Sequence, residues 1–145
     1  SDSRKEYENK RIGSQEIPFK IELSKFVSNH KDFQEDYSEE IELLKKVVID
    51  DTINEISCAF DYLDYLKDNI KRLKEIKKYY DKMNSSNSEK QKNYYLEGMK
   101  MLFDKGETVD NFEGILDEYK KALVNKETQI DKLNSELKEI RKLKI

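Results

Sequence analysis

Two stretches of this sequence carry apolar side chains every three or four residues over unusually long distances. This spacing gathers them on one face of an α-helix, which repeats every 3.6 residues. Only four Gly and one Pro occur in 145 residues, so few positions interrupt a helix. We therefore predict an all-α fold. The two stretches run through Ile41, Leu44, Val48, Ile53, Ile56, Phe60, Leu63, Ile70, Leu73, Ile76 and Tyr80, and through Leu116, Tyr119, Leu123, Ile130, Leu133, Leu137 and Ile140.

The first stretch predicts a helix from Ser38 to Met83. Ser38 suits the N-cap, and the acidic residues that follow it favour the positive end of the helix dipole. Such a helix would be about 65 Å long at 1.5 Å per residue. The β-branched residues between Val47 and Thr52 mark its weakest point, and the pattern leaves open whether the helix kinks there.

Turn-forming residues separate the remaining helices. The Ser/Asn-rich segment 84–88 predicts a break, because these side chains compete for backbone hydrogen bonds. Ser88 would cap a third helix that continues through Phe103 and ends at Gly106. Thr108 or Asp110 would begin the last helix, whose a/d heptad pattern is broken only by Lys126 and indicates a packing seam.

The N-terminal region divides into a polar part and an amphipathic part. Residues 1–16 show no apolar periodicity and predict a flexible tail or tether. Ile17, Ile21, Leu23, Phe26 and Val27 predict a short helix. We therefore expect one domain over residues 17–145, an elongated bundle of about four helices in which two are very long and coiled-coil-like.

The composition argues against catalysis and bound cofactors. His30 and Cys58 are the only histidine and cysteine, so a Cys/His zinc site with four ligands cannot form. A catalytic triad would depend on His30, which lies in a polar segment and suits a surface or capping role. The glycines are isolated, so no phosphate-binding loop is present. We expect no enzyme activity, metal or cofactor.

Charge is unevenly distributed along the first long helix. From Asp32 to Asp64 acidic residues far outnumber Lys45 and Lys46, whereas basic residues dominate from Lys67 to Lys82. This asymmetry could complement the helix dipole and neighbouring helices, or the acidic half could steer a basic protein partner. The formal net charge of -3 gives no reason to expect nucleic-acid binding. No apolar run approaches the roughly 18 residues that a membrane span requires.

The Lys/Glu/Asn/Ile/Tyr-rich usage, the polar leader Ser1–Glu6 and the near lack of Gly, Pro and Trp resemble the mature part of spirochaete outer-surface lipoproteins. The chain looks most like the factor H-binding proteins of relapsing-fever borreliae, whose coiled-coil-like helices the segment Leu116–Ile140 matches. The resemblance implies recruitment of the host complement regulator factor H, for immune evasion, at the bacterial outer surface. The tail would be the spacer to an N-terminal lipid anchor, whose cysteine this chain does not contain.

Loop position and chemistry select the candidate partner-binding residues. Asp104, Glu107, Asp110 and Asn111 lie in the connection before the last helix, and Tyr94 is a possible aromatic anchor. The alternative is a cytoplasmic coiled-coil structural or adaptor protein. Its last helix would pair with a partner coiled coil or with a second copy, giving a homodimer.

Overall fold

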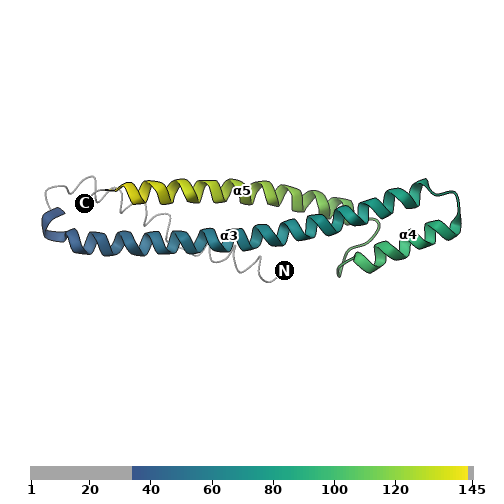
Figure 1. Cartoon of the computed structure of the whole chain (residues 1–145), viewed down its shortest axis with the longest axis horizontal. Coiled ribbons are helices and arrows are strands. Elements are labelled where there is room, and N and C mark those ends of the chain that lie inside the picture. The colour runs from purple at the N-terminus through teal and green to yellow at the C-terminus, as the bar shows by residue number, and fades with distance from the viewer. Residues whose placement is uncertain (1–33, 144–145) are drawn as a thin grey trace. The chain divides into compact units, whose positions relative to one another are not determined.

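The structure, a computed structural model, describes residues 34–143. Over these residues it is all-α, with helices α3 (Gln34–Ser85), α4 (Glu89–Leu102) and α5 (Phe112–Lys142) and no strand. The predicted all-α class is confirmed (Figure 1). The expected tail over 1–16, the expected helix over 17–27 and His30 lie outside the described residues.

Helix α3 is 52 residues long and is continuous through the β-branched run. Inside that run, the Thr52 hydroxyl donates a 2.7 Å hydrogen bond to the Val48 carbonyl oxygen, so this buried polar group is satisfied within the helix. The predicted start at Ser38 is wrong, because the helix begins at Gln34. No Gly or Pro separates the two positions, so nothing in the sequence stops the helix from beginning before Ser38.

Helix α4 begins as predicted and ends earlier than predicted. The Ser88 side chain caps it by accepting a hydrogen bond from the Gln91 backbone N–H. Gly106 does not end the helix, because Phe103 already adopts extended backbone after its N–H donates to the Met99 carbonyl oxygen. Phe103 packs against the hydrophobic core instead of continuing the helix. Gly106 lies in the following turn with φ of 86°, a conformation that favours glycine.

The last helix begins at Phe112, so the predicted start at Thr108 or Asp110 is a few residues early. The intervening residues form a turn in which the Thr108 carbonyl oxygen accepts hydrogen bonds from the N–H groups of Asn111 and Phe112. Phe112 is fully buried, which fixes the point where α5 enters the core.

The chain divides into two compact units, and α3 and α5 each contribute residues to both. The unit over residues 63–126 also contains α4, which folds back beside the C-terminal part of α3 (Figure 1). Its core joins all three helices. The buried side chains of this core are Ile70, Leu73, Ile76, Met99, Phe112 and Leu116.

The other unit pairs the N-terminal part of α3 with the C-terminal part of α5, which runs alongside it in the opposite direction (Figure 1). Ile41, Val48 and Ile140 form one buried cluster there. The later heptad positions of α5 are also buried, as the predicted seam requires: Ile130, Leu133, Leu137 and Ile140.

Part of the predicted stripe on α3 does not face the core. Leu44, Ile53 and Phe60 are 41%, 41% and 47% exposed, whereas Thr52 and Ala59 are buried beside them. A spacing of three and four residues fits two adjacent faces of this helix, and contact with α5 selects the face that carries Thr52 and Ala59. Ile53 and Phe60, seven residues apart, lie on one side of α3 and form a second, partly exposed apolar face, whereas Leu44 is exposed on the opposite side of the helix.

Candidate binding surface

Arg72 on α3 holds the connection between α4 and α5 in place. Its guanidinium donates to both carboxylate oxygens of Glu107, with a distance of 2.8 Å from Nη2 to Oε2, and forms a 3.2 Å ion pair with Asp104. Nη1 also donates to the Leu102 carbonyl oxygen at 3.0 Å, and Nη2 donates to Asn69 Oδ1 at 3.1 Å. One side chain thus satisfies a terminal carbonyl of α4 and anchors the loop that follows.

Hydrogen bonds within the connection give it a defined shape. Glu107 Oε1 accepts from the Asp104 backbone N–H at 2.9 Å. Asn111 joins two backbone positions: its Oδ1 accepts from the Thr108 N–H at 2.7 Å, and its Nδ2 donates to the Gly106 carbonyl oxygen at 2.9 Å. Two of its own side chains therefore fix the shape of segment 103–111 by bonding to its backbone.

Burial and pairing with Arg72 shift the pKa of the Glu107 carboxyl group in opposite directions. Burial acts to raise that pKa, but the hydrogen bonds from Arg72 and from the Asp104 N–H outweigh it and leave the pKa below its ordinary value. The pKa of Arg72 is raised, chiefly by its hydrogen bond with Glu107. The Glu107 side chain is only 6% exposed, so it is committed to Arg72 as a charged pair.

The outer face of α4 carries two apolar side chains separated by two helical turns. Tyr94 is 71% exposed and Met101 is 86% exposed, whereas Met99 between them is fully buried. The Tyr94 ring meets the Tyr95 ring edge-on, with centroids 5.4 Å apart. Tyr95 in turn contacts the ring of Tyr79 on α3. The exposed anchor is thus backed by aromatic rings that extend to α3.

Helices α3 and α4 approach each other closely at Gly98. A Cβ added at Gly98 would lie 3.1 Å from Cε1 of Tyr79, which is tighter than ordinary contact. Glycine therefore permits the Tyr79 ring to lie directly against the backbone of α4. Gly98 lies four residues after Tyr94 and three before Met101, so the Tyr79 ring packs beside the face of α4 that carries these two exposed side chains.

The predicted site residues fall into three groups. Asp104, Asp110 and Asn111 are exposed on the connection, although Asn111 uses its amide to shape the turn. Glu107 is turned inward to Arg72. Tyr94 lies on α4, nine residues before Phe103, or about 14 Å along the helix axis.

Sequence reasoning did not find Arg72 and Met101 as part of this surface. Arg72 is the one arginine among the lysines of the basic half of α3, and its residue type, suited to a bidentate carboxylate pair, was the only signal in the sequence. Met101 follows Tyr94 by seven residues, a spacing that places both on one helix face, so this pair could have been recognised.

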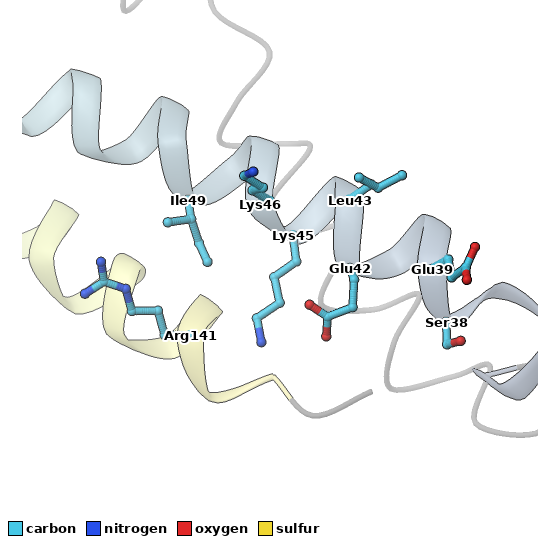
Figure 2. A pocket seen from close by; sticks show the side chains of 8 residues that line it. All are labelled: Ser38, Glu39, Glu42, Leu43, Lys45, Lys46, Ile49 and Arg141. Atoms are coloured by element: carbon cyan, nitrogen blue, oxygen red, sulfur yellow. The ribbon is translucent and has the colours of Figure 1, made fainter.

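The unit formed by the N-terminal part of α3 and the end of α5 carries an open groove of about 770 Å³ between these two helices (Figure 2). Lys45 extends across it and donates a 2.7 Å hydrogen bond to the Leu143 carbonyl oxygen. Charges of both signs line the groove, so it has no single electrostatic preference. Its lining residues are Ser38, Glu39, Glu42, Leu43, Lys45, Lys46, Ile49 and Arg141.

Within residues 34–143, no group of three or more His, Cys, Asp or Glu side chains is placed to hold a metal ion. None of the helices described is long and apolar enough to cross a membrane. Comparison of the chain with protein-family models, with curated proteins and with solved structures finds no match.

Proposed function

We propose that this chain is a non-catalytic binding protein whose docking surface is formed by the outer face of α4 and the α4–α5 connection. The observation that carries the proposal is the exposure of Tyr94 and Met101 on a helix whose inner side, at Met99, is fully buried. Exposed aromatic and methionine side chains on a rigid element are typical interface anchors.

The acidic connection favours a basic protein partner. Asp104 and Asp110 are exposed, and only Lys105 offsets them between Phe103 and Asn111 once Glu107 is paired with Arg72. Charge at the rim of an apolar patch raises association rates and selects partners of opposite charge. Factor H, which carries basic polyanion-binding modules, is the partner that the resemblance to borrelial surface lipoproteins implies. The chain would then act at the bacterial outer surface, held there by a lipid anchor.

Surface plasmon resonance with immobilised factor H tests this proposal. We expect binding at low ionic strength that weakens as salt rises, because screening reduces the contribution of exposed charges. Tyr94→Ser should weaken binding about tenfold or more, as the loss of an aromatic anchor commonly does. The combined Asp104→Asn and Asp110→Asn variant should bind more slowly and lose much of the salt dependence.

Matched controls separate this surface from general effects. Leu43→Ser removes a comparably exposed apolar side chain (65%) from the other unit, and should leave binding unchanged. The control for the double aspartate variant combines Asp117→Asn with Asp131→Asn, which removes the same charge from exposed positions of α5. Absence of binding at low ionic strength would exclude factor H as the partner. Equal losses in test and control variants would refute the proposed surface.

The coiled-coil alternative loses support from the burial of the heptad seam. Leu133 is 0% exposed and Leu137 is 8% exposed, so the seam of α5 that predicted pairing with another chain already packs inside its own unit. A partner helix would have to use a different face.

A further inference from the structure

Helix α3 carries a row of five exposed lysines within the unit over residues 63–126. They follow one another at intervals of four, three, four and four residues, so they lie within about 80° of one another around the helix axis. The row is about 22 Å long, and neighbouring positions are about 4.5–6 Å apart along the axis. This lysine row consists of Lys67, Lys71, Lys74, Lys78 and Lys82.

Contacts within the chain do not account for the lysine row. Lys78 forms an exposed ion pair with Glu75 at 3.5 Å, and the Lys82 ammonium lies 6.0 Å from the centroid of the Tyr95 ring. The other three lysines of the row form no ion pair with any residue in the range 34–143. Most of these charges therefore have only solvent as a partner within that range.

The helix dipole accounts for only the last of these lysines. Cations are favoured near the C-terminal end of a helix, but the effect is confined to about the last turn, where Lys82 lies. Along the rest of the row, like charges three or four residues apart repel each other and oppose helix stability. The lysine row therefore points to an anion outside the chain.

Carboxylates border the lysine row and limit its width. Asp64 lies one turn before the row and ends it. Asp68 and Glu75 lie along one side of the row, and Asp81 lies along the other side, where it pairs with Lys77 at 3.2 Å. A wide anionic surface would also meet these carboxylates and be repelled by them. A narrow anionic chain would contact the lysines alone.

We propose that the lysine row binds a linear sulfated polysaccharide that lies along α3. In such a ligand the charges are distributed ring by ring along a narrow chain, as the ammonium groups are distributed turn by turn along the helix. Lysine ammonium groups are point charges, so they attract sulfate without the fixed geometry of a bidentate contact. The proposal is independent of the factor H surface, which is formed by α4 and the connection.

The side chains around the lysine row favour this ligand over a membrane or a nucleic acid. No large apolar side chain is exposed between Lys67 and Lys82, so the row has no anchor to insert into a bilayer. The rings of Tyr79 and Tyr80 are half-buried and pack against aromatic rings of α4 and α5, so they are not free to stack on bases.

Surface plasmon resonance of the full chain on immobilised heparin tests the proposal. We expect binding at low ionic strength that weakens as salt rises, because screening reduces the attraction between exposed charges. The triple variant Lys67→Gln, Lys71→Gln and Lys74→Gln should weaken binding about tenfold or more. Glu75→Gln removes a bordering carboxylate and should strengthen binding, a change that a loss of folding cannot produce.

A matched triple variant controls for net charge. Lys121→Gln, Lys132→Gln and Lys138→Gln also remove three exposed lysines, in this case from α5. This variant should bind heparin nearly as tightly as the unaltered chain. Circular dichroism should show the same helix content in both triple variants.

Any one of three results would overturn the proposal. One is the absence of heparin binding at low ionic strength. Another is an equal loss of affinity in the two triple variants, because position in the lysine row would then be irrelevant. The last is binding to duplex DNA, or to vesicles of phosphatidylcholine and phosphatidylserine, that depends on the row and is tighter than binding to heparin. That result would assign the row to a wide anionic surface.

Discussion

The bridge from Arg72 to Glu107 allows a quantitative test of how the α4–α5 connection is held. The Arg72 side chain is 19% exposed and that of Glu107 is 6% exposed. Glu107→Gln keeps the shape of the side chain and removes its charge. Arg72→Met keeps most of the apolar stem and removes the guanidinium.

The magnitude follows from what each variant leaves behind. Glu107→Gln leaves Arg72 with Asp104, Asn69 and the Leu102 carbonyl oxygen as partners, so the guanidinium is not stranded. We expect a loss of about 1.5–3 kcal/mol in the free energy of unfolding, the range for hydrogen bonds to charged groups. Arg72→Met should cost more, because it leaves the Glu107 carboxylate with a single donor, the Asp104 N–H.

A double-mutant cycle measures the interaction itself. Urea unfolding at pH 7, followed by circular dichroism, should give a coupling energy between Arg72 and Glu107 of about 1–2 kcal/mol. The exposed pair of Lys77 and Glu113, whose charged atoms lie 3.2 Å apart, is the matched control and should show much weaker coupling. Equal coupling in the two cycles would refute the reasoning, because burial would then contribute nothing.

The remaining predictions concern four single positions. Gly114→Ala should stabilise the chain by about 0.5–1 kcal/mol, because a Cβ there meets nothing within 4 Å. Gly98→Ala should give no such gain, or should destabilise the chain, because the new methyl group would press against the Tyr79 ring. Urea unfolding midpoints compare the two variants. Equal stabilisation by both would contradict the close approach of Tyr79 to Gly98. The pKa of Glu107 is lowered in the folded chain, so its contribution to stability is present above the unfolded pKa of 4.5 and disappears as pH falls through the lowered value. Stability curves from pH 7 to pH 3 should therefore converge for the unaltered chain and Glu107→Gln. Burial, then a hydrogen bond with Tyr65, raises the pKa of Tyr119 to about 12, so its contribution to stability is present below the ordinary value of 10 and is lost as pH rises through about 12. Absorbance at about 295 nm should therefore show a late titration that Tyr119→Phe removes.

Local signals predicted most of the fold. The all-α class, the break near Asn84 and the Ser88 cap follow from helix periodicity and from side chains that bond to nearby backbone. Helix ends were less predictable. Phe103 leaves helical geometry to pack on the core, and Phe112 marks where α5 enters it. Both ends depend on contacts between segments distant in sequence, which no local pattern records.

The candidate site was predicted only in outline. Loop position correctly placed Asp104 and Asp110 at the surface, and Tyr94 is exposed as an anchor should be. Composition alone could not separate Glu107 from its acidic neighbours. Its partner, Arg72, lies 35 residues away on another helix, so the pair exists only once α3 and the connection meet.

The sequence by itself determined that this chain forms helices, because the spacing of its apolar residues and the scarcity of Gly and Pro act within a few residues of one another. Only the tertiary structure decided which apolar face of α3 became core. The stripe with Ile53 and the face with Ala59 are both compatible with a helix, and packing against α5 buries only the second. Such a choice depends on the partner helix, and a local pattern contains no information about that partner.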